Sequence, residues 1–483
     1  MFRAFGLPRR LPFGVPLGVP FGLPFRMPFR MPLGMCQRRC TLNHKSNSEN
    51  DFCWVDDYFS HIRPHFDVRE ADDLLIILPN KAVKLNRTGL TVLRLLKDGR
   101  SIGEILKGLG DNAERRMDLF YFLCDFRSLM TGCLGEGQKR KAVQTVPHTG
   151  SFNLLPVLSE VAVTYRCNLK CAFCYAACGC QKKEDSNTEM STRELFKIFK
   201  VIRKDAQVPS ISFTGGEPLL RKDIVELVAG AKKAGLRVNL ISNGTLLSGN
   251  DLAERLHDAG LNSAQISIEG PTAETHDSLT GVSGSFEKTL KGISSLKDAN
   301  IHVHTNTTVN SRNAEHLVDL VKVVAEIGMA RMSMNMVIPA GSASGRELQI
   351  SYSKIWSFVE PARNAARKLG VEFMWYSPTP MCIFNPLAEG LGNKSCAACD
   401  GLLSIAPNGD VLPCSSYSQP VGNLLRKPFE EVWNSTTSLF FRRKEYAPEE
   451  CSGCGKFTAC AGACPLYWTA VGTGELIALS KVS

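Results

Sequence analysis

Short apolar segments alternate with helix-length amphipathic segments over residues 158–340, and this alternation is what most constrains the fold. Strands that alternate with helices form parallel β/α units, whose functional residues lie at the carboxyl ends of the strands. The pattern itself fits either a partial barrel or an open, doubly wound sheet. The six expected strands are residues 160–165, 210–214, 237–242, 263–268, 302–308 and 331–337.

Of the intervening segments, one carries a signal for the start of a helix and another carries a signal for the termination of a helix. Ser191 stands at the capping position before residues 192–204, and Glu194 follows where a capping box requires it. The segment 223–234 runs into Gly235, and glycine commonly terminates a helix. We therefore expect a helix over each of these two segments.

Three cysteines follow the first expected strand closely, with the spacing C-x-x-x-C-x-x-C at Cys167, Cys171 and Cys174. A closed structural zinc or iron–sulfur site takes four protein ligands. A loop with three thiolates therefore suits an iron–sulfur cluster in which one iron is open to another ligand. The alternative on these residues is a zinc knuckle completed by Cys178 or Cys180.

With Phe173 before the last cysteine, this loop resembles that of the radical S-adenosylmethionine (SAM) enzymes. The resemblance implies that the three cysteines hold a 4Fe-4S cluster and that the amino and carboxylate groups of SAM bind its open iron. It also implies reductive cleavage of SAM to methionine and a 5'-deoxyadenosyl radical, with Phe173 near the adenine. In fold, it favours α/β architecture with a partial (β/α)6 TIM-like barrel over the open sheet.

The turns after the next strands resemble the SAM-binding segments of the same family. In Thr214-Gly-Gly-Glu-Pro218, two glycines allow close approach of the backbone to a ligand, and a glutamate can accept a hydrogen bond from an ammonium group. The two later turns resemble segments that contact methionine and ribose, and ordinary strand-ending turns are the alternative for them. The expected SAM-binding residues are Phe173, Gly215, Gly216, Glu217, Ser242, Asn243, Ser267 and Glu269.

A second set of cysteines follows the expected barrel. The spacing C-x9-G-x4-C from Cys399 through Gly409 to Cys414, followed by C-x2-C-x5-C-x3-C, resembles the SPASM extension of radical SAM enzymes, which carries auxiliary iron–sulfur clusters. The resemblance implies a first auxiliary cluster on Cys399, Cys414, Cys464 and either Cys396 or, less readily, Cys382. It implies a second auxiliary cluster on Cys451, Cys454 and Cys460.

The SPASM pattern contains one further cysteine after this quartet, and none follows here before Ser483. We therefore expect a second auxiliary cluster that is open, ligated by another kind of group, or absent, or else a truncated chain. On spacing alone, Cys451, Cys454, Cys460 and Cys464 also fit a zinc ribbon.

Residues 70–145 are expected to form a separate unit, with a strand at 74–79, a turn at 84–89 and helices at 90–96, 102–109 and 115–129. The pattern, with Leu85-Asn-x-Thr and Asp98-Gly99 before Ser101, resembles the PqqD-like domains that bind the leader of a ribosomally made peptide. Such domains receive the leader as an added strand at a sheet edge. A generic winged helix or a structural cap is the alternative.

The net charge of +10 does not indicate a nucleic-acid partner, because eight Lys or Arg residues and no acidic residue lie within residues 1–48. Proline at every fourth position from Pro8 to Pro32 predicts a disordered tail there. No apolar run of about 20 residues is present to span a membrane. Cysteines in C-x-x-C groups indicate metal ligation in a reducing compartment, so we expect a cytoplasmic protein.

The sequence thus predicts a disordered tail at 1–50, a PqqD-like domain at 70–145, a radical SAM core at 155–345 and a SPASM domain at 380–470. The expected protein is a radical SAM oxidoreductase that modifies a precursor peptide and receives electrons from a flavodoxin or ferredoxin. Its cofactors are SAM, a 4Fe-4S cluster and one or two auxiliary clusters. The alternatives are a radical SAM/SPASM enzyme of haem or other tetrapyrrole biosynthesis, a sulfatase-type protein maturase, or a non-catalytic iron–sulfur or zinc scaffold.

Overall fold

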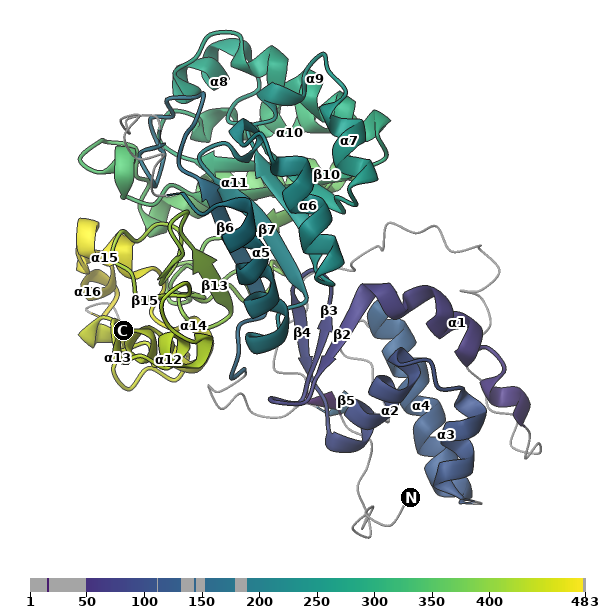
Figure 1. Ribbon diagram of the computed structural model, residues 1–483. Helices are drawn as coiled ribbons and strands as arrows, with labels where there is room; N and C mark the ends of the chain where they lie inside the picture. Colours follow the sequence, from purple (N-terminus) through teal and green to yellow (C-terminus); the bar gives the residue numbers. More distant parts are fainter. Residues whose placement is uncertain are drawn as a thin grey trace. The chain divides into compact units, whose positions relative to one another are not determined.

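The computed structural model describes residues 15–16, 49–110, 112–131, 143–144, 153–178 and 189–480, in two compact units that divide between Leu154 and Leu155 (Figure 1). The predicted disordered tail lies outside the described residues, except for β1 (Val15–Pro16), which pairs with β5 (Val143–Gln144), and the start of a short 3-10 helix (Glu49–Phe52). Each unit has its own hydrophobic core.

The first unit combines a three-stranded antiparallel sheet with four helices. The rings of Phe59 and Phe126 stack at 5.3 Å in its core, and Phe66 packs edge-on to Phe126 at 5.4 Å. Its elements are α1 (Val55–Ile62), β2 (Phe66–Arg69), β3 (Leu74–Ile77), β4 (Lys81–Lys84), α2 (Arg87–Lys97), α3 (Ile102–Leu109) and α4 (Ala113–Met130).

The three predicted helices of this unit are present, and β3 occupies most of the predicted strand. The sequence analysis missed α1, β2 and β4. Each of these two strands has only four residues, with polar residues among the apolar ones, so neither gives a readable alternation. The predicted turn at 84–89 is wrong for residues 87–89, which are the first residues of α2. Asn86 caps this helix and accepts a hydrogen bond from the Gly89 amide at 2.8 Å.

The second unit is built on a ten-stranded sheet in the order β12-β11-β10-β9-β8-β7-β6-β13-β14-β15. The six predicted strands are β6 (Leu158–Thr164), β7 (Ser210–Gly215), β8 (Arg237–Ser242), β9 (Ser263–Ser267), β10 (His302–Val309) and β11 (Arg331–Met336). The sheet extends beyond them through parallel β12 (Glu372–Trp375) and β13 (Leu402–Ile405), then antiparallel β14 (Asp410–Leu412) and β15 (Gly422–Asn423). The SPASM region thus continues the barrel sheet.

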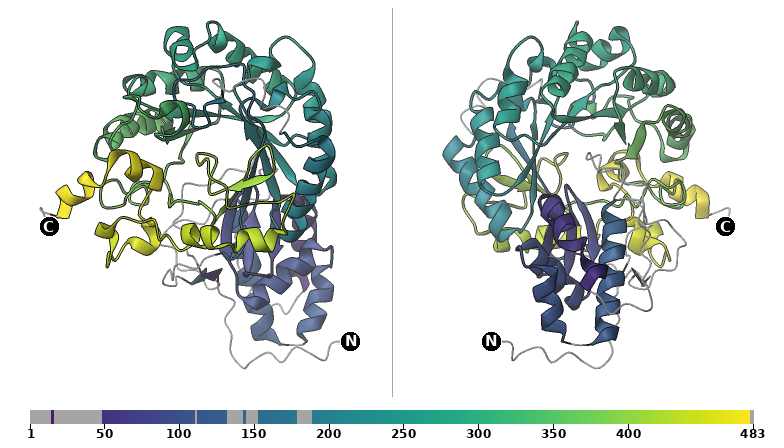
Figure 2. Two further views of the ribbon diagram at one scale, coloured as in Figure 1. Left: turned by 60° about the vertical axis from the view of Figure 1, so that its left-hand side comes forward. Right: turned by 90° about the vertical axis from the view of Figure 1, so that its right-hand side faces the viewer.

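Helices lie along the outer side of this curved sheet (Figure 2). A doubly wound sheet would carry helices on both faces, so the fold is the partial barrel. The helices between the strands are α5 (Thr192–Lys200), α6 (Ile224–Lys233), α7 (Leu252–Asp258), α8 (Ala273–Thr280), α9 (Ser285–Asp298), α10 (Leu317–Glu326) and α11 (Tyr352–Lys368). The later ones are α12 (Phe429–Trp433), α13 (Thr436–Arg442), α14 (Phe457–Cys460), α15 (Pro465–Val471) and α16 (Gly474–Ser480).

Both predicted helix signals are present in the second unit. Ser191 and Glu194 form the capping box of α5, which continues as a π-helix over Val201–Asp205. The helix α6 ends shortly before Gly235, which has a φ of +82°. In the part of the chain that the structure describes, no helix is both long and apolar enough to cross a bilayer.

Candidate functional site

The loop that follows β6 carries Cys167, Cys171 and Cys174, and backbone amides point at two of the three sulfurs. The Leu169 amide donates to Cys167 Sγ at 3.4 Å, and the Cys178 amide donates to Cys174 Sγ at 3.4 Å. Such hydrogen bonds favour the thiolate form, which is the form that binds iron.

The carboxyl end of α8 holds the backbone of the same loop. Lys170 donates its amide hydrogen to the Thr280 carbonyl at 2.8 Å, and Ala172 donates to the Leu279 carbonyl at 2.9 Å. These two bonds flank Cys171 on either side. The position of the central cysteine is therefore fixed by a neighbouring helix.

The three thiols lie close enough to influence one another. Burial raises the pKa of Cys167 to about 11, and the charges of Glu217 and Cys174 add to this. Burial also raises the pKa of Cys171 well above its usual value, with further contributions from Glu269 and the other two cysteines. A hydrogen bond with the Cys178 side chain, by contrast, lowers the pKa of Cys174 to about 6. A bound cation stabilises neighbouring thiolates, so the three residues fit an iron–sulfur cluster.

The Gly-Gly-Glu turn after β7 lies directly against the start of the cysteine loop. The Gly216 amide donates to the Thr164 carbonyl at 2.8 Å, and the Glu217 amide donates to the Arg166 carbonyl at 2.8 Å. A Cβ added at Gly216 would lie 2.3 Å from the Arg166 carbonyl oxygen, so a side chain has no room there. Gly215 has a φ of +124°, which also requires glycine.

Glu217 is fully buried and is hydrogen-bonded to two other predicted SAM-binding residues. Its carboxylate accepts hydrogen bonds from the Ser242 hydroxyl at 2.9 Å, the Asn243 amide at 2.9 Å and the Leu219 amide at 3.0 Å. Burial raises the pKa of Glu217 to about 7, while these hydrogen bonds lower it. An ammonium group bound here would offset the cost of burying the carboxylate.

Glu269 is a second buried carboxylate at this edge of the sheet. Burial raises its pKa to about 8, and the Thr308 amide donates to its carboxylate at 2.9 Å. Ser267, which ends β9, lies two residues before it. Phe173, which precedes Cys174 in the cysteine loop, packs with Ala172 in an apolar cluster of Val337, Ala343 and Leu348.

The sequence analysis missed several polar residues of this region. Asn168 accepts a hydrogen bond from Asn243 at 2.9 Å and donates one to Thr245 at 2.8 Å, so it connects the cysteine loop to the turn after β8. His276 accepts the Glu269 amide at 3.1 Å through Nδ1. An asparagine in a loop carries no signal by itself, because the partners of Asn168 are far away in the sequence.

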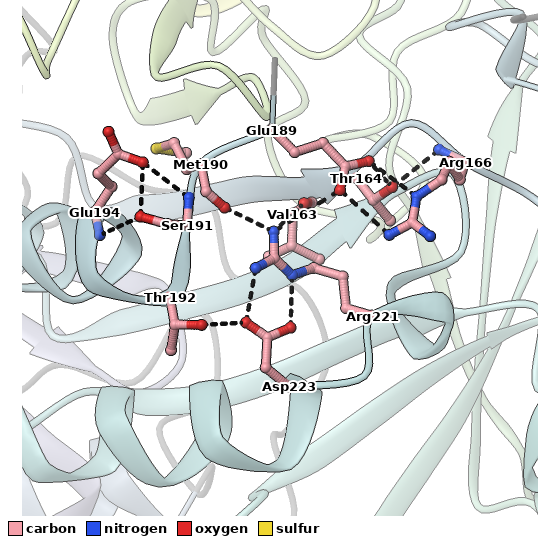
Figure 3. Close-up of polar contacts among 10 residues, drawn as sticks. All are labelled: Val163, Thr164, Arg166, Glu189, Met190, Ser191, Thr192, Glu194, Arg221 and Asp223. Atoms are coloured by element: carbon pink, nitrogen blue, oxygen red, sulfur yellow. Dashed lines mark hydrogen bonds and ion pairs between the residues drawn. The ribbon is translucent and has the colours of Figure 1, made fainter. Parts of the chain in front are cut away.

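A network of ion pairs and hydrogen bonds joins the two ends of the cysteine loop (Figure 3). The buried guanidinium of Arg221 donates to the Val163 carbonyl at 3.1 Å, where the chain leaves β6, and to the Met190 carbonyl at 2.9 Å, where it enters α5. Asp223 accepts two further hydrogen bonds from Arg221, at 2.9 and 2.7 Å. Glu189 pairs with Arg166 at 3.1 Å and also accepts from the Thr164 hydroxyl.

Replacing Arg221 with methionine is expected to destabilise β6 by about 2 to 4 kcal/mol, because one carboxylate and two carbonyls lose their donor. Native-state hydrogen exchange of the β6 amides measures this change. The matched control is Arg255→Met, whose partner Asp251 is exposed and 3.8 Å away. We expect the control to change the same free energy by less than about 0.5 kcal/mol. Equal effects of the two variants would contradict the role of Arg221.

The SPASM cysteines fall into two groups. Burial raises the pKa of Cys399, Cys414 and Cys464, and the charge of Cys396 raises each of them further, so these four lie near one another. Cys451, Cys454 and Cys460 form the other group. Among the described residues, no three Cys, His, Asp or Glu side chains are arranged to hold a single metal ion. The ligands of a multi-iron cluster bind different irons and lie farther apart than those of one ion.

This geometry defines an iron–sulfur enzyme on a partial β/α barrel. The family model of the radical SAM superfamily matches residues 161–324, and that of the SPASM iron–sulfur cluster-binding domain matches residues 396–455. The AdoMet-dependent heme synthase of Nitratidesulfovibrio vulgaris is 30% identical over 325 residues, which are 62% of this chain and 85% of that protein. The PqqA peptide cyclase of Xanthomonas euvesicatoria pv. vesicatoria is 27% identical over 324 residues, which are 64% of this chain and 82% of that protein.

The chain therefore belongs to the radical SAM superfamily and carries a SPASM domain. It is a radical SAM oxidoreductase that uses SAM, a 4Fe-4S cluster and auxiliary iron–sulfur clusters, and is not a scaffold. Its fold is similar to that of Streptococcus suis SuiB bound to S-adenosylmethionine, with a TM-score of 0.62 and 17% identity over 84% of this chain and 95% of that chain. The anSMEcpe structure with bound AdoMet has a TM-score of 0.53 and 18% identity over 67% of this chain and 95% of that chain.

Proposed function

We propose that this enzyme modifies a ribosomally made peptide, whose leader binds to the first unit. Support comes from the architecture of that unit, a small antiparallel sheet with helices, which suits recognition by strand addition. SuiB has also been solved with the precursor peptide SuiA, at a TM-score of 0.61, and the PqqA peptide cyclases are named for a peptide substrate.

The two edges of the sheet in the first unit are the places where a leader can add as a strand. The strands β2 and β4 are the edges. The β2 edge is already engaged, because Arg94 donates to the Val68 carbonyl at 2.9 Å, Lys97 donates to the Phe66 carbonyl, and the Val68 amide donates to Asp67 at 2.9 Å. The strand β4 is in contact with β1 (Val15–Pro16), so an added strand at either edge displaces existing contacts.

The face of the barrel sheet turned away from the helices is polar, whereas the interior of a TIM barrel is usually filled by branched apolar residues. Side chains of neighbouring strands pair across it: Asn239 with Ser212 at 3.3 Å, and His304 with Gln265 at 3.1 Å. Asn306 donates to Asn335 at 2.8 Å on the same face. A peptide backbone offers many donors and acceptors, so this polar face suits a peptide substrate.

In the proposed reaction, bound SAM and its cluster supply the radical that removes a hydrogen atom from the substrate, with the electron coming from a flavodoxin or ferredoxin. We assign Glu217, Ser242 and Asn243 to holding the amino end of SAM. Glu160, on β6, is a candidate to accept a proton from the substrate. Burial raises the pKa of Glu160 to about 7, and a hydrogen bond with Ser415 lowers it.

The test is anaerobic reconstitution followed by mass spectrometry. The enzyme, SAM and reduced flavodoxin are incubated either with small peptides encoded near its gene or with an iron-containing tetrapyrrole. We expect a mass change in one peptide together with 5'-deoxyadenosine, and none in the tetrapyrrole. A mass change in the tetrapyrrole alone would contradict the proposal and support haem biosynthesis, the activity for which the 30% identical relatives are named.

A further inference from the structure

The segment 379–381, which directly precedes Cys382, lies against Cys460 of the second SPASM group, Cys451, Cys454 and Cys460. The Met381 amide donates to Cys460 Sγ at 3.4 Å, and Cys460 Sγ contacts the Thr379 carbonyl at 4.0 Å. Two backbone groups of this segment therefore flank the sulfur of Cys460. Cys382 follows Met381 directly in the chain, and Cys382 is exposed.

Electrostatic interactions connect Cys382 with the three cysteines of the second SPASM group, Cys451, Cys454 and Cys460. Burial raises the pKa of Cys382, and the charges of Cys460 and Cys454 raise it further. Burial also raises the pKa of Cys451 to about 11, with contributions from Cys460, Cys382 and Cys454.

The first SPASM group already contains four thiols, which is the usual number for a fully ligated cluster. The second group contains only Cys451, Cys454 and Cys460 from the C-x2-C-x5 pattern. We infer that Cys382 is the fourth thiolate of the second auxiliary cluster. The inference concerns an iron–sulfur centre of the SPASM domain and does not depend on whether the substrate is a peptide.

This assignment changes the expectation from the sequence, in which Cys382 was a secondary candidate for the first auxiliary cluster. It also makes an open or non-cysteine-ligated second cluster unnecessary. The spacing could not show this, because Cys382 lies far from Cys451 in the chain and outside the SPASM pattern.

The first test uses thiol alkylation of the full-length, anaerobically reconstituted chain, read out by peptide mass spectrometry. Cys53 is the matched control, because it is also exposed and lies in the first unit. We expect iodoacetamide to label Cys53 equally with and without iron, and to label Cys382 at least about tenfold more slowly until a chelator removes the iron. Equal labelling of Cys382 in both states would overturn the inference.

The second test counts iron and sulfide in single and double variants. Cys382→Ala and Cys451→Ala should each lose iron from the same cluster, so the double variant should lose no more than the more affected single variant. Cys382→Ala combined with Cys396→Ala should show additive loss, because two different clusters are affected. Cys53→Ala should lose no iron.

If the iron losses of Cys382→Ala and Cys451→Ala are additive, whereas those of Cys382→Ala and Cys396→Ala are not, Cys382 belongs to the first auxiliary cluster and the inference is overturned. Unchanged iron in Cys382→Ala would overturn it as well. Mössbauer spectra identify the cluster type that remains in each variant, so a misfolded SPASM domain, which would lose both auxiliary clusters, is recognised and also counts against the assignment.

Discussion

Replacing Cys167, Cys171 and Cys174 together with alanine is expected to abolish SAM cleavage while the SPASM domain keeps its iron. Each thiolate would ligate a cluster whose open iron must bind SAM, so a chain without them has no site for the reaction. The iron content should fall by about four per chain. The SPASM cysteines all lie after residue 380, outside this loop.

The measurements are 5'-deoxyadenosine formation by chromatography and iron and sulfide analysis of the same preparations. The matched control is Cys53→Ala, which removes an exposed thiol from the first unit. It should cleave SAM as the unchanged enzyme does. Full cleavage by the triple variant would end the assignment of these cysteines to the SAM-binding cluster.

The parts of the fold that the sequence predicted are those set by local patterns. Strands such as β7 and β8 are short segments with apolar residues at alternate positions, separated by amphipathic helices, and Ser191 and Glu194 mark the start of α5. These signals depend on residues only a few positions apart. The six strands of the partial barrel were accordingly predicted close to their observed bounds.

The strands that were missed have partners that no local pattern identifies. The strand β13 is only four residues long and pairs with β6, more than two hundred residues earlier in the chain. The strand β12 extends the other edge of the sheet beside β11. Their place in the sheet depends on where the rest of the chain has folded, so the sequence analysis ended the barrel too early.

The residues of the candidate site likewise divide into those that a local sequence pattern identifies and those that it does not. The cysteine and Gly-Gly-Glu motifs can be read from the sequence because their spacing is specific. The network of Arg221 with Val163, Met190 and Asp223 cannot, because a buried arginine is recognised only when its acceptors are known. The role inferred for Cys382 could not be read from the sequence for the same reason, since its neighbours in space lie in the distant C-x2-C-x5-C pattern.

Removing residues 1–145 is expected to leave uncoupled SAM cleavage within about twofold of the intact enzyme, and to lower kcat/KM for a full-length precursor peptide by about 100-fold or more. The two activities should separate because the core of the second unit contains no residue before Leu155. A leader bound as an added strand supplies affinity remote from the reacting atoms and keeps the rest of the peptide at high effective concentration.

A precursor without its leader is the matched control, because the intact and shortened enzymes should modify it equally slowly. Calorimetry with the leader peptide adds a direct measurement of binding to the intact chain, which the shortened chain should lose. If the shortened enzyme modifies the full-length precursor as well as the intact one does, the first unit does not bind the leader. In that case the tetrapyrrole becomes the better candidate substrate, since the radical SAM and SPASM parts of the chain serve either reaction.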